Sequence, residues 1–263
     1  MTDLPAPALL AAAGLHLDVA GPLATVVLDK ADRRNSQTPR MWTALADIGD
    51  ALPPEVRVVV VRGAGQSFSS GLDRDLLSGV GLRGEQSIPA LMAESDDTIL
   101  DTVAGFQRGF AWLRDPRFVS VAAVQGHAIG GGFQLALHCD LRVVAEDAQL
   151  CMKEPALGIV PDLGGTKLLV DSVGYSRAME ICATGRFVGA AEARGMGLAT
   201  VVVPRDELDG AVDDLVAALL ATPAGAVRET KALLLGAGDR SLDEQRRFER
   251  EAQLRRFVEL RGS

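Results

Sequence analysis

Short, almost wholly apolar runs recur along the chain and alternate with segments that repeat their apolar positions every three or four residues. Residues 58–61, 118–124 and 141–145 are such runs, as expected for strands that are covered on both faces of a sheet. Residues 38–52 show the helical repeat, with a Thr-Pro start and an apolar face made by Met41, Leu45, Ile48 and Leu52. Strands that alternate with helices predict an α/β fold built on a mainly parallel sheet.

Both ends of the chain and one central section depart from this alternation. Residues 15–30 alternate polar and apolar positions on either side of a Gly-Pro turn, which predicts a β-hairpin. Residues 76–115 begin with loop-forming residues and end in a helical repeat, so this section is either a lid beside a site or an ordinary surface excursion. The apolar residues of the last helix, after Ser241, do not share one face. That distribution predicts contact on more than one side, for example with a neighbouring subunit.

Charge and composition exclude several classes of partner. The net charge of −8 argues against a nucleic-acid or anionic-membrane partner. The three cysteines form no C-x-x-C pair and are odd in number, which indicates buried thiols in a reducing compartment. No apolar run approaches the roughly 20 residues of a membrane span, and no metal-ligand spacing is present. We therefore expect a cytoplasmic protein with no membrane insertion and no metal site.

Two glycine-rich segments follow two of the predicted strands. "GAGQSFSSGLD" occupies residues 63–73, and "GHAIGGGFQL" occupies residues 126–135. Each lies at the carboxyl end of a strand, where open α/β sheets bind ligands. Neither dinucleotide-binding nor P-loop spacing is present in the glycine triplet at 130–132. Two converging backbone N–H groups would form an oxyanion hole; the alternative is two tight strand-to-helix turns.

Three ordered motifs resemble the crotonase superfamily, the enoyl-CoA hydratases and isomerases. They are "SFSSGLD", "AAVQGHAIGGGFQLALHCDLRVVAEDAQ" and "KEPALGIVPDLGGTKLLVDSVG". The resemblance implies a spiral of ββα units and a helical C-terminal region. It also implies that the amides of Leu72 and Gly131 hold a thioester carbonyl, and that the helix starting there stabilises an enolate. Coenzyme A would then enter as part of the substrate, with no permanently bound cofactor.

The same resemblance implies a set of substrate-binding residues. Cations after the first strands suit the CoA phosphates, although the arginines there could simply be solvated. The stretch from Ser69 to Asp73 would follow the pantetheine and the adenine. The expected CoA and substrate contacts are Lys30, Arg33, Arg34, Asn35, Ser70, Gly71, Asp73, Gly130 and Gln134.

The acidic residues distinguish between reactions of this family. Its hydratases carry one glutamate where this chain has Gln134 and a second that matches Glu154. Asp162 matches an acid of the dienoyl-CoA isomerases and of the ring-opening isomerases of phenylacetyl-CoA degradation. An amide cannot shuttle protons at neutral pH. The resemblance therefore predicts that Glu154 and Asp162 transfer protons in a double-bond isomerase of fatty-acid or related acid degradation.

Alternatives to this interpretation stay open at the level of sequence. Asp162 precedes two glycines, so its alternative role is to cap the helix that begins near Gly165. Hydration of a 2-enoyl-CoA by Glu154, with help from Gln134 or Asp162, is the alternative reaction. An acyl-CoA-binding relative that has lost catalysis is the alternative from another class.

Two regions are expected along the chain. Residues 1–203 would form the ββα core with the CoA and catalytic site, and residues 204–263 a helical region that drives assembly. The resemblance implies a homo-oligomer, either a trimer or a dimer of trimers.

Overall fold

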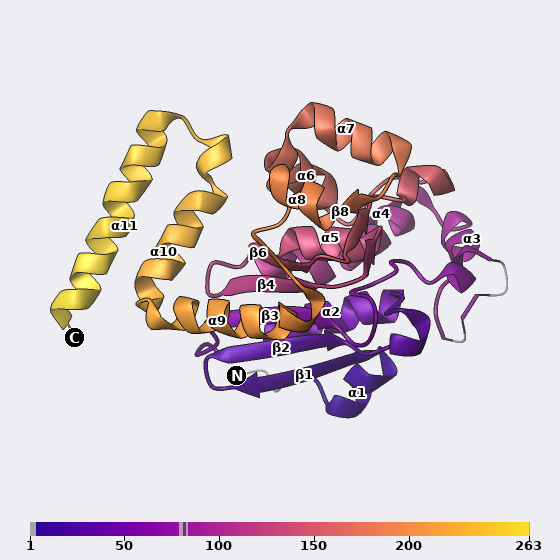
Figure 1. Ribbon diagram of the computed structural model, residues 1–263, viewed down its shortest axis with the longest axis horizontal. Helices are drawn as coiled ribbons and strands as arrows, with labels where there is room; N and C mark the ends of the chain where they lie inside the picture. Colours follow the sequence, from indigo (N-terminus) through magenta and orange to yellow (C-terminus); the bar gives the residue numbers. More distant parts are fainter. Residues whose placement is uncertain (1–3, 79–80, 83, 263) are drawn as a thin grey trace.

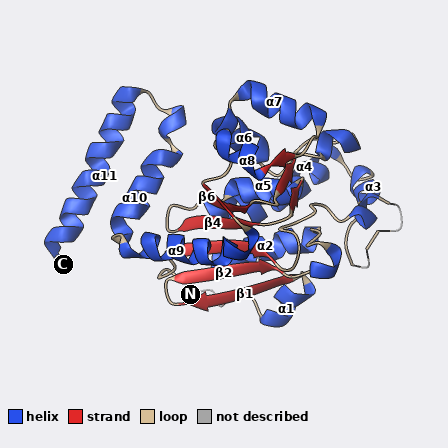
Figure 2. Cartoon of the chain, viewed as in Figure 1, coloured by secondary structure: helices blue, strands red, loops and turns tan. Residues whose placement is uncertain are grey.

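The computed structural model describes residues 4–78, 81–82 and 84–262, and its centre is a six-stranded sheet (Figures 1 and 2). The strand order is β1-β2-β3-β4-β6-β9. β1 and β2 pair antiparallel, which confirms the predicted hairpin, and the remaining strands pair parallel. The bounds are β1 Leu15–Ala20, β2 Leu23–Leu28, β3 Val58–Gly63, β4 Val119–Val124, β6 Leu141–Ala145 and β9 Val201–Val203. The α/β class and the three apolar strands are thus confirmed.

A second, three-stranded sheet lies beside the first and carries the glycine triplet. Its strands are β5 (His127–Ile129), β7 (Gln149–Cys151) and β8 (Val188–Gly189). β5 pairs parallel with β7, which in turn pairs antiparallel with β8. Because β5 ends at Ile129, the triplet leads directly from this sheet into α5 (Gly131–His138).

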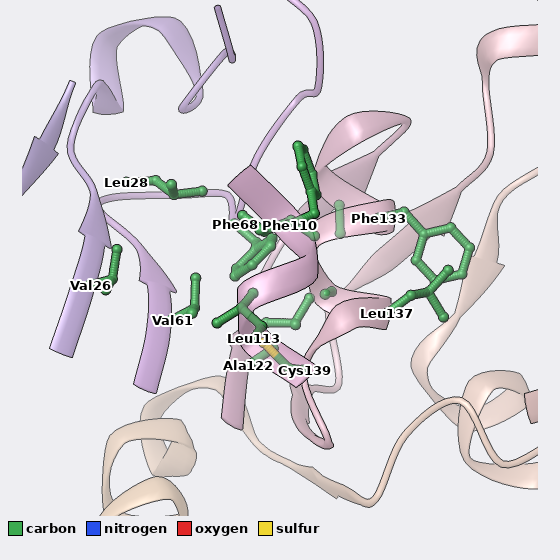
Figure 3. Close-up of a cluster of buried hydrophobic side chains, with 14 of the residues drawn as sticks. Val26, Leu28, Val61, Phe68, Phe110, Leu113, Ala122, Phe133, Leu137 and Cys139 are labelled. Atoms are coloured by element: carbon green, nitrogen blue, oxygen red, sulfur yellow. The ribbon is translucent and has the colours of Figure 1, made fainter. Parts of the chain in front are cut away.

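Helices cover both faces of the large sheet and enclose two apolar cores. On one face, α5 is buried at all of its residues, and Figure 3 shows side chains of this core around it. On the other face, α9 (Leu208–Ala221) packs on β3, β4 and β6 through Leu208, Val212 and Val216. The other helices are α1 Pro7–Ala12, α2 Pro39–Ala51, α3 Ile88–Met92, α4 Asp96–Ala111, α6 Gly165–Val173, α7 Tyr175–Thr184, α8 Ala190–Gly195, α10 Ala224–Leu235 and α11 Leu242–Gly262.

The ambiguous section between Leu76 and Asp115 contains two helices. α3 is short, whereas α4 packs along α2, so the helical repeat predicted there is confirmed. Residues 79, 80 and 83 of this section lie outside the described residues. The choice between a lid and a surface excursion therefore stays a prediction.

The C-terminal helices α10 and α11 lie side by side and project from the rest of the molecule (Figure 1). Ser241 caps α11: its Oγ accepts from the Glu244 N–H, and the Glu244 carboxylate accepts from the Ser241 N–H. The apolar side chains left exposed on α11 are Leu242, Leu254, Phe257, Val258 and Leu260. Across the described residues, no single helix is long and apolar enough to cross a membrane, and one bent pair, 205–221 with 224–239, passes by length and composition only.

Candidate active site

The two glycine-rich segments meet at the end of the large sheet. Ser69 N–H donates to the His127 carbonyl at 2.9 Å, and Ile129 N–H donates back to the Ser69 carbonyl at 3.0 Å. Gly71 has a φ of +76°, and a Cβ atom there would lie only 2.3 Å from the Ile129 carbonyl oxygen. Only glycine permits both this backbone conformation and this approach. The loop after β3 therefore reaches the start of α5.

The N–H groups of Leu72 and Gly131 are left free by this arrangement. Gln37 N–H donates to the Gly71 carbonyl, and Asp73 N–H donates to the Gln37 carbonyl, both at 2.8 Å. These two bonds turn the intervening Leu72 N–H to the opposite side. In the part of the chain that the structure describes, neither this N–H nor that of Gly131 has an acceptor. Gly131 opens α5, so the positive end of that helix adds to the local potential.

Glu154 places a buried carboxylate against the same glycine turn. Glu154 is the first residue of a short 3₁₀ helix, Glu154–Leu157, and is 7% exposed. Gly130 has a φ of +51°, which favours glycine, and a Cβ atom there would lie only 3.1 Å from Glu154 Oε1. Oε1 accepts from Gln134 Nε2 at 2.7 Å, whereas Oε2 is enclosed and has no partner among the described residues. Burial raises the pKa of Glu154, and the nearby charge of Asp162 acts in the same direction.

Asp162 is half-buried near Glu154, and burial also raises its pKa. Its backbone carbonyl accepts from Gln107 Nε2 at 2.7 Å, which fixes the loop that carries it. The N-cap residue of α6 is Gly164, and no side-chain hydrogen bond caps that position. The alternative that Asp162 caps this helix is therefore wrong.

Gln134 connects the two acidic segments. It lies on α5 and is fully buried. Its Oε1 accepts from Leu163 N–H at 3.0 Å and from Gly165 N–H at 3.1 Å, at the start of α6. Its Nε2 donates to Glu154. The Gln134 carboxamide, which was predicted to contact substrate, thus makes its hydrogen bonds within the protein. It joins the start of α6 to the carboxylate of Glu154.

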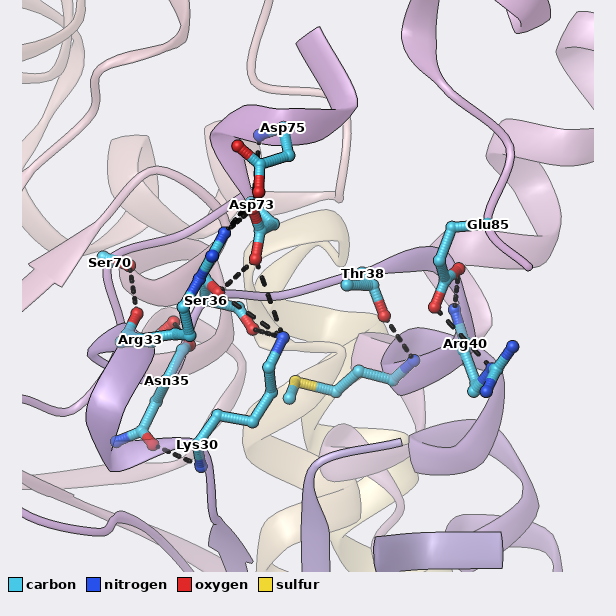
Figure 4. Close-up of polar contacts among 12 residues, drawn as sticks. Lys30, Arg33, Asn35, Ser36, Thr38, Arg40, Ser70, Asp73, Asp75 and Glu85 are labelled. Carbon is cyan, nitrogen blue, oxygen red and sulfur yellow. Dashed lines mark hydrogen bonds and ion pairs between the residues drawn. The ribbon is translucent and has the colours of Figure 1, made fainter. Parts of the chain in front are cut away.

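A cavity of about 300 Å³ adjoins Leu72, and several of the residues predicted to contact CoA line it. It is lined by Arg33, Arg34, Ser36, Ser70, Leu72, Asp73, Arg74 and Ile129. Figure 4 shows the polar network of this region. Arg33 donates to Asp73 at 2.8 Å and to Asp75 at 2.7 Å, so its charge is already matched within the protein.

Two residues predicted to contact CoA face the protein instead. Asn35 is fully buried: its Nδ2 donates to the Ala64 and Ser67 carbonyls, and its Oδ1 accepts from Lys30 N–H. The prediction that Asn35 contacts CoA is therefore wrong. The Lys30 ammonium donates to the Ser36 carbonyl at 3.2 Å and lies 3.7 Å from the Asp73 carboxylate. Lys30 thus supports the wall of the cavity.

Sequence reasoning missed one cation of this cavity, Arg74. It is the first residue of the short helix Arg74–Leu77 and directly follows the "SSGLD" motif. That position next to the motif could have indicated a CoA contact. Arg34 and Arg74 are both exposed at the cavity, and neither has a carboxylate partner among the described residues. Two unpaired guanidinium groups therefore border the cavity that adjoins the Leu72 N–H.

The chain is similar to proteins of one enzyme family. The family described as enoyl-CoA hydratase/isomerase matches residues 21–260. The peroxisomal Δ(3,5)-Δ(2,4)-dienoyl-CoA isomerase of Arabidopsis thaliana is 33% identical over 192 residues, which are 73% of this chain and 68% of that protein. The carnitinyl-CoA dehydratase of Salmonella enteritidis is 31% identical over 246 residues, covering 92% of this chain and 88% of that protein.

Among solved structures, a Thermobifida fusca protein assigned as an enoyl-CoA hydratase and crystallised with CoA is 52% identical. Its TM-score is 0.95, and the match covers all of both chains. A family match over most of the sequence, together with relatives above 30% identity, supports one conclusion. The chain belongs to the enoyl-CoA hydratase/isomerase family, the crotonase superfamily.

Proposed function

We propose that this enzyme shifts a double bond in an unsaturated acyl-CoA. The observation that carries the proposal is a pair of acids: Glu154 lies against the glycine turn, Asp162 is close enough for its charge to act on Glu154, and burial raises the pKa of both. A carboxyl group whose pKa is raised is a better proton carrier at neutral pH than an exposed one. The position at which hydratases of the family hold a second glutamate is occupied by Gln134, and its amide oxygen already accepts two N–H groups.

The thioester is held by backbone donors. In our proposal the Leu72 and Gly131 N–H groups bind its carbonyl oxygen, and they bind it more strongly when that oxygen gains negative charge in the enolate. CoA extends through the cavity beside Leu72 toward Arg34 and Arg74, which meet its phosphates. The CoA bound to the Thermobifida relative supports this assignment of the substrate class. CoA is the part of the substrate that the enzyme binds, and it leaves the site still attached to the product.

Proton transfer is divided between the two acids. Glu154 is the base, because the Gln134 N–H bond to its Oε1 favours the ionised form and Oε2 stays free to accept a proton. It removes a proton from a carbon whose anion is conjugated with the thioester, and the electron pair moves onto the thioester oxygen. Asp162, which lacks such a side-chain donor, delivers its proton to the far end of the conjugated system. The double bond is displaced, and transfer of one proton from Glu154 to Asp162 restores the enzyme.

A panel of thioesters tests the proposed function. Purified enzyme is incubated with 2-enoyl-, 3-enoyl- and 3,5-dienoyl-CoA esters of equal chain length in deuterated water. Isomerisation moves the double bond and introduces one deuteron at carbon, whereas hydration of the 2-enoyl ester adds a hydroxyl group. Rapid hydration without isomerisation of any ester would refute the proposal and favour the hydratase alternative. Binding without either reaction would favour a non-catalytic relative.

We further propose that the C-terminal region assembles the enzyme as a trimer or a dimer of trimers. The supporting observation is the projecting pair of helices α10 and α11, of which α11 carries five exposed apolar residues between Leu242 and Leu260. α9 lies beyond residue 203 but packs on the core sheet, so the projecting part begins at Ala224. Light scattering after gel filtration measures the mass. A monomer at micromolar concentration would contradict this assignment.

A further inference from the structure

The side of α11 that faces away from α10 is apolar and basic. Ala252 is buried where α11 packs on α10, and a helix turns by about 100° per residue. Leu254, two residues on, therefore lies nearly opposite, and it shares that side with Phe257, which is 49% exposed. Arg250 and Arg261 lie on the same side, one turn before and one turn after these residues. These four residues form the basic face of α11, and neither of its arginines has a partner within the described ranges.

The side of α4 that faces away from α2 carries the opposite charge. α4 packs on α2 through Phe106, whose ring centroid lies 4.8 Å from that of Trp42. On the opposite side of the helix Asp97 and Asp101 are exposed, and Leu100 beside them is 68% exposed. These three residues form the acidic face of α4, and no described residue pairs with either carboxylate. The helix dipole favours an acid in the first turn, as at Asp97, but Asp101 lies beyond that turn.

The basic face and the acidic face lie toward opposite ends of one molecule. In Figure 1, α11 projects at one end, whereas α4 lies with α3 toward the other. The two faces can therefore meet only between two copies of the chain. A contact between two different faces of identical chains is heterologous, and its repetition closes into a ring if the rotation allows. The trimer proposed above is a ring of this kind.

We propose that the basic face of α11 docks on the acidic face of α4 in the next copy of the chain. Leu254 and Phe257 then cover Leu100, and the arginines on either side pair with the two aspartates. An anionic lipid surface suits this helix less well, because the net charge of the chain is −8. The contact borders the candidate active site, since α4 also carries Gln107, whose Nε2 donates to the Asp162 carbonyl at 2.7 Å. This inference names the contact behind the proposed assembly and rests on that proposal.

Charge reversal tests the pairing of the two faces. One variant combines Arg250→Glu with Arg261→Glu, a second combines Asp97→Arg with Asp101→Arg, and a third carries all four substitutions. Light scattering after gel filtration gives the mass of each protein over a range of concentrations, and thermal unfolding shows whether each is folded. The first two variants bring like charges together across the contact, so their dissociation constants for assembly should rise at least about tenfold. The third variant restores opposite charges and should assemble nearly as the wild type does.

A matched control and a mixing experiment separate this contact from a general effect of charge. Asp213→Arg with Asp214→Arg makes the same charge change at two exposed residues of α9, and its mass should equal that of the wild type. A mixture of the first two variants should associate again, because each supplies the face that the other lacks. Wild-type mass in the first two variants, dissociation of the control, or a dissociated third variant would overturn this inference alone. A monomeric wild type would overturn the proposed assembly with it and leave the proposed reaction standing.

Discussion

Replacement of Gln134 by glutamate should inactivate the base rather than restore a hydratase. The change puts a carboxylate oxygen where Gln134 Nε2 now lies, 2.7 Å from Glu154 Oε1. Two unit charges at that separation repel by about 6 kcal/mol at an effective dielectric constant near 20. A tenfold change in a protonation equilibrium corresponds to only about 1.4 kcal/mol. The pair should therefore retain one proton throughout the neutral range.

The retained proton should reside on Glu154. The new carboxylate inherits the Leu163 and Gly165 N–H groups and the start of α6, all of which favour its ionised form. Glu154 loses the Gln134 donor and is already disfavoured as an anion by burial, so its pKa rises further. At pH 7 the base is then protonated, and isomerisation should fall by about 10²–10⁴, the range for loss of a general base.

The assay is the isomerisation rate of Gln134→Glu and the wild type between pH 6 and pH 10. The optimum of the variant should lie at higher pH than that of the wild type, because Glu154 loses its proton at higher pH, and its rate should stay lower because Asp162 must still hold a proton there. Glu154→Gln is the matched control, and its isomerisation activity should stay low at every pH. A variant that isomerises like the wild type at pH 7, or that gains rapid hydration with an unmoved profile, would refute the reasoning.

Substitutions at three further places probe the rest of the site. Leu72→Pro removes a backbone donor and should reduce turnover by about 10²–10³, whereas Leu72→Ala keeps the N–H and should lose far less activity. Equal losses of activity in two folded variants would show that the Leu72 N–H does not bind the thioester. Arg34→Gln with Arg74→Gln should raise the KM for acyl-CoA severalfold at low ionic strength and much less at 1 M salt, and an unchanged KM at low salt would exclude these arginines from the CoA site. Asp162→Asn should slow isomerisation by about 10²–10⁴ without lowering the melting temperature, since this side chain caps no helix; a stability loss with normal turnover would reverse that assignment.

The sequence by itself determined the local features of this protein. The apolar runs predicted β3, β4 and β6, and the alternating residues around the Gly-Pro turn predicted the β1–β2 hairpin. The Thr38 cap is present as expected, because its hydroxyl accepts from Met41 N–H at 3.3 Å. Such features depend on residues within one or two turns of each other, so a linear pattern contains the information. Each glycine or acidic motif is likewise a contiguous stretch of residues, and the order of these motifs along the chain indicated the family.

Only the tertiary structure decided how the polar side chains are used. The separation in sequence between Arg33 and its partners Asp73 and Asp75 is about 40 residues, and no local pattern shows that these charges neutralise one another. Gln134 joins Glu154 to the start of α6 only because α5 brings three distant segments together. Gln37 is fully buried, which no local pattern shows. Its enclosure results from the packing of Trp42 and Gly131 around it, and the hydrogen-bonding capacity of a buried group depends on neighbours that folding supplies.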